Sequence, residues 1–60
     1  MTAKYNVCFS DPWHGAVVRG SFERAVKDED EAIRYQVYYE MKYKEFYDDE
    51  FAAVELVSVR

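Results

Sequence analysis

Residues 26–33 read VKDEDEAI, and this stretch decides the fold because a strand ends in it and a helix begins in it. Asp28 is a favourable N-cap residue, and Glu31, three positions later, completes an Asp-x-x-Glu form of the capping box. Acidic side chains here also lie at the positive end of the helix dipole. The helix is therefore predicted to start at Asp28 and to continue to about Tyr47, since no Gly or Pro interrupts it.

The predicted helix carries its apolar residues in two rows, because residues three and four positions apart share a helix face. The first row comprises Ala32, Tyr35, Tyr39, Tyr43 and Phe46. The second comprises Ile33, Val37 and Met41, and it is separated from the first by Glu40 and Lys44, which form an i,i+4 pair. One helix on one small sheet buries one broad row. The second row therefore either wraps around the sheet edge or faces a partner, and it is a candidate homodimer interface.

Two strands are predicted before the helix. Residues 4–10 alternate, with Tyr5, Val7 and Phe9 on one side. Residues 11–15, Asp-Pro-Trp-His-Gly, are typical of a turn. Residues 16–26 form the second strand, with Val18, Phe22 and Val26 on its inner face. Gly20 in its middle indicates a bulge or a close backbone approach.

One strand is predicted after the helix. The helix ends without Gly, so Asp48 or Asp49 is expected to adopt the left-handed conformation. Residues 51–60 form the last strand, and its inner face is ambiguous. Val54 and Leu56 point one way, whereas Ala53, Val57 and Val59 point the other.

The element order predicts a single α+β domain, residues 1–60, of the type β-β-α-β. A short loop between the first two strands implies an antiparallel hairpin. A right-handed crossover then places strand three beside strand one. We therefore expect a three-stranded antiparallel sheet of order 2-1-3, with the helix packed on one face and the other face open.

The composition offers little for catalysis or for metal binding. Cys8 is the only cysteine and His14 the only histidine, so neither a disulfide within the chain nor a Cys/His metal site is expected. His14 follows Cys8 and Ser10 closely, but no acid is placed to orient it as a base. We expect a protein that is not an enzyme and that carries no cofactor.

Charge and hydropathy limit the partners. The net charge is −4, which opposes direct binding to nucleic acid. No run of about 18 apolar residues is present, so no membrane span is expected. The first residues do not form a secretion signal. A cytoplasmic protein is therefore expected.

The residues of the chain are better suited to binding than to catalysis, because Trp and Tyr are frequent anchors of interfaces. Candidate partner-binding residues are of two kinds, aromatic and acidic, and the acidic ones would face a basic surface. They are Trp13, Tyr38, Tyr47, Asp48, Asp49 and Glu50, followed by Asp28, Glu29, Asp30 and Glu31. Two alternatives remain open. Each aromatic residue could instead cover the core and leave its polar atom in water. The acidic residues could instead only solubilise the chain or complement the helix dipole.

The stretch of residues 26–33, followed by a tyrosine-bearing helix and a Val-rich last strand, resembles small phage-encoded proteins that inhibit host machinery. The order of elements is similar to that of the short RNA-polymerase inhibitors of podovirus-type coliphages, and anti-CRISPR proteins belong to the same broad class. The resemblance spans roughly Phe22 to Arg60 and implies a class of protein, without assigning a role to any residue.

These observations predict a small acidic inhibitor that binds and blocks a host nucleic-acid-handling protein, such as a CRISPR effector or RNA polymerase. Its carboxylates would mimic nucleic-acid charge on a surface that normally holds phosphates. The alternative is a self-associating structural module, a homodimer without an inhibitory role.

Overall fold

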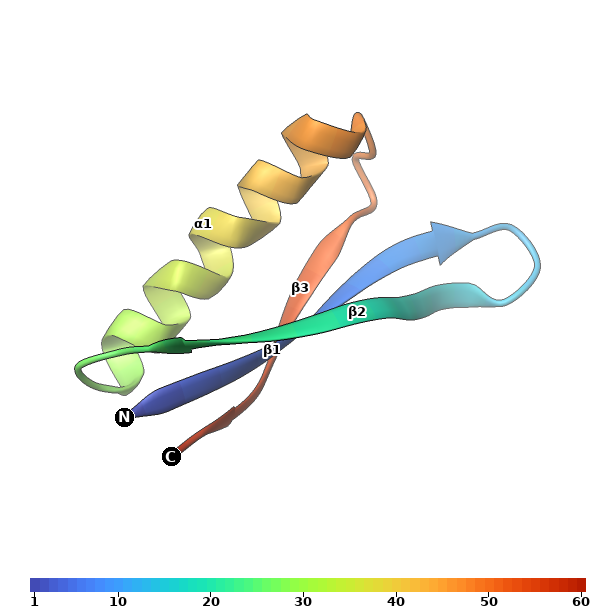
Figure 1. Ribbon diagram of the computed structural model, residues 1–60. Helices are drawn as coiled ribbons and strands as arrows, with labels where there is room; N and C mark the ends of the chain where they lie inside the picture. The colour runs from blue at the N-terminus through green and yellow to red at the C-terminus, as the bar shows by residue number, and fades with distance from the viewer.

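The chain folds in the order β-β-α-β. The computed structural model describes all 60 residues, with elements β1 (Thr2–Asp11), β2 (Gly15–Ala25), α1 (Glu29–Tyr47) and β3 (Ala53–Val59). The strands form one antiparallel sheet in the order β2-β1-β3. Helix α1 covers one face of the sheet, and the turn between β1 and β2 lies away from the helix (Figure 1). The predicted α+β fold and strand order are confirmed.

A bulge in β3 settles which of its faces is inner. Lys4 pairs with Ser58, but Tyr5 pairs with Leu56, so Val57 has no residue opposite it in β1. The extra residue turns Val59 onto the face that carries Val54 and Leu56, because side chains alternate along a strand. The sequence had placed Val59 on the opposite face with Ala53 and Val57, which is wrong for Val59. The strand also begins at Ala53 and not at Phe51, since residues 48–51 form the turn after the helix.

A second bulge lies in β2, next to Gly20 as predicted. Val7 pairs with Gly20, whereas Cys8 pairs with Val18, and Arg19 is the extra residue. The shift puts Val17 opposite Phe9 on the inner face and sends Val18 to the open face. The prediction that Val18 faces inward is therefore wrong, and Val18 is half exposed. The predicted inner positions of Phe22 and Val26 are confirmed, because both belong to the packed core.

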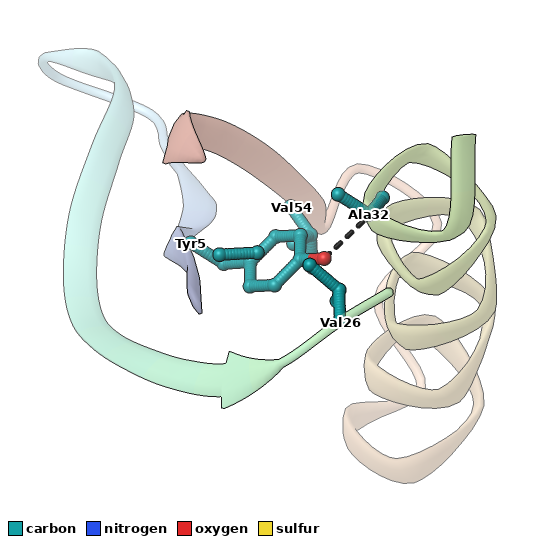
Figure 2. Close-up of a cluster of buried hydrophobic side chains, with 5 residues drawn as sticks. Tyr5, Val26, Ala32 and Val54 are labelled. Atoms are coloured by element: carbon teal, nitrogen blue, oxygen red, sulfur yellow. Dashed lines mark hydrogen bonds between the residues drawn. The ribbon is translucent and has the colours of Figure 1, made fainter. Parts of the chain in front are cut away.

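The core is small and is centred on Tyr5, which is fully buried. The five core residues are Ala3, Tyr5, Val26, Ala32 and Val54. The Tyr5 ring crosses the space between sheet and helix, and its hydroxyl donates to the Ala32 carbonyl at 2.7 Å (Figure 2). Phe22 stacks on this ring with 5.1 Å between ring centroids, and Tyr39 meets Phe22 edge-on at 4.8 Å. Aromatic packing around one tyrosine thus joins α1 to the sheet.

Both ends of α1 are capped by acidic residues. The Asp28 carboxylate accepts from the Glu31 N–H at 2.8 Å, and Glu31 accepts from the Lys27 N–H at 3.1 Å. The capping box is therefore confirmed, except that Glu31 reaches Lys27 and not the backbone of Asp28 itself. At the other end Asp48 adopts φ 51° and ψ 42°, in the left-handed region. The Asp49 N–H donates to Lys44 and the Asp48 N–H to Glu45, as in a Schellman motif.

The helix also caps the outer edge of β3. Gln36 Nε2 donates to the Val54 carbonyl at 2.9 Å, and the Val54 N–H donates to Glu40 Oε1 at 3.2 Å. These bonds satisfy backbone groups that an edge strand otherwise presents to another chain. Of the second row on the helix, Ile33, Val37 and Met41 are all more than half exposed. The row therefore lies beyond the sheet edge without covering it.

We expect Tyr5→Phe to lower the free energy of unfolding by about 1–2 kcal/mol, because the variant leaves the buried Ala32 carbonyl without its tyrosine donor. Urea unfolding followed by circular dichroism measures the change. Tyr38→Phe is the matched control, since Tyr38 is half exposed and its hydroxyl makes no hydrogen bond within the chain, and it should change stability by less than about 0.5 kcal/mol. Equal effects of the two substitutions would contradict the role given to the Tyr5 hydroxyl.

The same tyrosine predicts a stability loss at alkaline pH. Burial raises the pKa of the Tyr5 phenol, and the nearby Tyr39 raises it further. The unfolded chain releases this proton near pH 10, whereas the folded chain holds it to higher pH. The contribution of Tyr5 is therefore complete below about pH 10 and is lost as pH rises through the folded pKa. The stability difference between wild type and Tyr5→Phe should shrink in urea titrations above that pH, and a constant difference would count against the assignment.

We expect Asp48→Gly to stabilise the fold by roughly 0.5–1.5 kcal/mol. Glycine adopts the left-handed conformation without steric cost, and loss of the carboxylate removes a charge that opposes the helix dipole. The midpoint of thermal unfolding should rise by several degrees. Asp48→Ala removes the same charge but keeps a Cβ, so it should be less stable than Asp48→Gly by about 1 kcal/mol. If the two variants have the same midpoint of thermal unfolding, the backbone conformation at residue 48 does not limit stability.

Candidate functional site

The flank of α1 that faces β2 carries an aromatic groove. Two adjacent i,i+4 rows of the helix line it, because residues four apart lie one above the other. The groove has a volume of about 340 Å³, and its lining residues are Tyr38, Tyr39, Lys42, Tyr43, Phe46 and Tyr47. Five of these six residues are aromatic, so the surface is apolar apart from one ammonium group and the tyrosine hydroxyls.

A second depression of about 180 Å³ continues this groove onto the sheet, and it shares Tyr43 and Tyr47 with it. Its sheet-side lining is Val7, Phe9, Arg19, Gly20, Ser21 and Phe22. Gly20 contributes no side chain, and nothing lies within 4 Å of the place where its Cβ would be. The inner face of β2 is therefore open at this point. The two depressions together are called the aromatic groove below.

The rings of the groove support one another. The Tyr43 and Tyr47 rings stack with centroids 6.0 Å apart, and Phe9 from β1 meets Tyr47 edge-on at 5.0 Å. Phe46 also meets Tyr47 edge-on, at 4.9 Å, yet Phe46 is 79% exposed. Phe46 was predicted to lie on the buried row of the helix, and this is wrong because Tyr47, the next residue, takes the sheet-facing position against Phe9. An ordered aromatic surface is left facing solvent.

Cations border this surface. The Arg24 guanidinium lies 3.7 Å above the centre of the Tyr35 ring and donates to the Tyr39 hydroxyl at 2.8 Å. This hydrogen bond raises the pKa of Arg24, which stays charged at every physiological pH. Lys42 Nζ lies 5.5 Å from the centre of the Tyr38 ring. Neither cation forms an ion pair within the chain, so both can meet an anionic partner group.

The predicted acidic residues do not form one surface. Asp28 to Glu31 lie at the start of α1 and Asp48 to Glu50 just after its end, and 19 helical residues span about 28 Å. Asp28 and Glu31 cap the helix, while the Asp49 carboxylate accepts from the Phe51 N–H at 2.9 Å. Four of the seven have backbone roles: these three in hydrogen bonds, and Asp48 in the turn conformation. Glu29, Asp30 and Glu50 remain as exposed carboxylates.

The three predicted aromatic anchors are placed differently. Tyr47 and Tyr38 both line the groove. Tyr38 was expected to lie away from the tyrosine row, but its ring lies 5.3 Å from the Tyr39 ring and is continuous with that row. Trp13 is 89% exposed in the turn between β1 and β2, which lies away from α1 (Figure 1). The groove therefore unites Tyr38 and Tyr47 and leaves Trp13 apart.

The groove contains residues that sequence reasoning did not select as binding residues. Tyr43 and Phe46 were assigned to the core-facing row, and Phe9 and Phe22 to the inner sheet face. Lys42 and Arg24 were not selected at all. The signal that could have found the helical part is the pair of rows 38-42-46 and 39-43-47, five of whose six members are aromatic.

The remaining reactive side chains form only local contacts. His14 Nδ1 lies 3.5 Å from the Asp11 carboxylate, which also accepts from the Trp13 N–H at 2.8 Å. That backbone N–H lowers the pKa of Asp11, and His14 adds to the effect. Cys8 lies in β1 opposite Val18 and Ala53. No three His, Cys, Asp or Glu side chains gather where they would hold a metal ion.

Helix α1 is not apolar enough to cross a membrane. No protein family, no curated protein and no solved structure matches the chain. The aromatic groove is therefore the basis for a proposed function.

Proposed function

We propose that this protein acts by binding another protein, with the aromatic groove as its contact surface. The observation that carries the proposal is the group of solvent-exposed rings at Tyr38, Phe46 and Tyr47 in the lining of the groove. Aromatic side chains held in place lose little conformational entropy on binding and are frequent energetic anchors of interfaces. A contiguous apolar patch on so small a domain is also typical of an interaction site.

The shape of the groove favours a macromolecular partner over a small ligand. Sites for small molecules enclose most of the ligand surface. Here Tyr38 and Tyr47 are half exposed and Phe46 is mostly exposed, so the walls are low. Such a shallow surface can bind the side chains of a partner protein that also contacts the chain on both sides of the groove.

The charge distribution favours protein over nucleic acid. Aromatic rings with neighbouring cations are used to bind single strands, and the groove has both. However, only Arg19, Arg24 and Lys42 border it, the net charge is −4, and the acidic turn after Tyr47 lies beside it. A phosphate backbone gains its affinity from many clustered cations, which this surface lacks.

The overall dimensions support a domain whose surface is completed by a partner. Its accessible surface is 4548 Å², against about 4100 Å² for a typical monomer of this mass. Its radius of gyration is 11.7 Å, against roughly 10.4 Å for a compact chain of this length. The chain is therefore thin and extended, and it leaves apolar surface that a second protein would cover.

Inhibition of a nucleic-acid-handling host protein, such as a CRISPR effector or RNA polymerase, stays a prediction within this proposal. The acidic clusters lie at opposite ends of α1 and mostly serve its caps, so extended charge mimicry has little support. If the protein is such an inhibitor, the groove would act by occupying an apolar site on the target. The exposed carboxylates would then add long-range attraction to a basic surface.

Self-association is the second candidate function, and the second row of α1 favours it. Ile33, Val37 and Met41 lie on the flank opposite the groove and are exposed by 51%, 55% and 66%. Two copies of such a row can pack across a two-fold axis. This surface is narrower than the groove and has no aromatic residue.

Site-specific crosslinking tests both candidates. We expect a photo-crosslinking amino acid at Phe46 to capture a partner protein in cells that produce the chain, and Tyr38→Ala in the same chain to reduce the yield about tenfold or more, since anchors of this kind contribute 2 kcal/mol or more. Both positions are exposed, so folding should be unaffected, which circular dichroism checks.

The matched control carries the crosslinker at Met41, on the opposite flank. A partner captured from Met41 and not from Phe46 would refute the groove as contact surface. A product with twice the mass of the chain from Met41 would favour the homodimer, and sedimentation at micromolar concentration would then show a species heavier than 7.2 kDa.

A further inference from the structure

The sheet has two edges, and α1 protects only one of them. Gln36 and Glu40 bond to the backbone of Val54 and so block part of the β3 edge. The opposite edge belongs to β2, which is 11 residues long and contains no Pro. Helix α1 packs on the inner face of β2 through Phe22 and Arg24, but none of its side chains bonds to a backbone group on the outer edge of β2. The free β2 edge therefore runs beside the aromatic groove.

The pairing pattern identifies the backbone groups on this edge. The Val26 N–H donates to Met1 at 2.8 Å, so inward-bonding residues of β2 alternate from Val26 through Arg24 and Phe22. The residues between them, Ala25, Glu23 and Ser21, direct their N–H and C=O groups away from β1. The Arg24 side chain reaches the Ala25 carbonyl at 3.3 Å, which is consistent with this direction. No side chain bonds to the backbone of Ser21 or Glu23.

Two cations beside this edge, Arg24 and Lys42, favour a partner that carries negative charge. Arg24 lies on the inner face, opposite Ala3, and its guanidinium is held by the Tyr35 ring and the Tyr39 hydroxyl. Lys42 follows on the same flank of α1, over Tyr38. Both lack a carboxylate partner in a chain whose net charge is −4. An inward-facing charge and the bulge at Arg19 also discourage indiscriminate strand pairing, so a suitable partner has to supply the complementary charge.

We infer that the partner binds as an extended, acidic peptide segment that pairs with the free edge of β2 as a fourth strand. This inference rests on the proposed function and names the form of the partner. Main-chain hydrogen bonds to Ser21 and Glu23 give affinity, as in other strand-addition complexes. Every second side chain of the peptide points toward α1. There an apolar residue packs on the tyrosine rings, and a carboxylate meets Arg24 in a charge-assisted hydrogen bond.

The probe is a displayed library of random linear peptides of about 12 residues, long enough for one strand, selected on the intact protein. We expect the enriched sequences to have apolar residues at every second position. At least one Asp or Glu should occupy a position of the same set, so that it lies on the peptide face that points toward α1. A synthetic peptide of the enriched sequence should then protect the Ser21 and Glu23 amides from hydrogen exchange in wild type.

Two substitutions at one position test the edge. Glu23→Pro removes the outward N–H while Pro is tolerated at such edge positions, and it should weaken peptide binding about tenfold or more. Glu23→Ala keeps the N–H and should bind within about twofold of wild type. Arg24→Gln should weaken binding of the acidic peptide about tenfold and leave a Gln-substituted peptide unaffected. If Glu23→Pro fails to fold, amide protection in wild type still decides.

The outcomes separate this inference from the proposed function. Enriched peptides whose apolar residues are spaced i,i+3 and i,i+4 would bind as helices. If they also leave the Ser21 and Glu23 amide hydrogens exchanging freely, strand addition is overturned, while the groove remains a binding site. Enriched peptides without acidic residues, or no enrichment at all, would overturn the acidic extended segment. Protection of Ser21 and Glu23 in the protein alone, increasing with its concentration, would show that a second copy occupies the edge. Loss of crosslinking at Phe46 would instead refute the groove itself.

Discussion

The hydrogen bond from the Tyr5 hydroxyl to the Ala32 carbonyl is the contact on which the arrangement of the whole domain depends. It joins the central strand to the first turns of the helix, and Tyr5 and Val54 are the only large side chains that are fully buried. A helix fixed at this point lies over β1 and β3. Strand β2 is then left with one uncovered edge, and the aromatic residues on the near flank of α1 pack on the sheet with only part of their surface, as Tyr39 does on Phe22 and Tyr47 on Phe9.

The sequence predicted the fold because its signals are local. Asp28 and Glu31 mark the helix start by the hydrogen bonds they can make, and alternation marks β1 by the burial of Tyr5 and Val7. The errors arose where one extra residue changes the register. Alternation cannot show that Val57 and Arg19 bulge, since a bulge depends on the pairing of two distant strands. Each bulge moved a valine, Val59 or Val18, to the face opposite the predicted one.

The site was predicted less well than the fold, for a related reason. Residue type alone marks Trp13, Tyr38 and Tyr47 as anchors, and Tyr38 and Tyr47 do line the groove. The groove itself needs Phe9 and Phe22 from the sheet, whose approach to the helix is a tertiary contact. The acidic residues were selected for their charge, but Asp28, Glu31, Asp48 and Asp49 have backbone roles that account for their positions without a partner.

In a chain of this size, one sheet edge is covered by the helix and contributes to stability, and the other edge is left free for binding. Covering an edge requires side chains, and Gln36 and Glu40 are used for this on β3. The same helix does not also cover the outer edge of β2, because one helix has one broad packing face and the core is already minimal. The uncovered side is therefore where a partner can add both backbone hydrogen bonds and apolar contacts. Arg24, inward-facing and held between two tyrosines, restricts that side to partners that neutralise it, so the residue that limits unwanted strand pairing also sets the specificity of the proposed site.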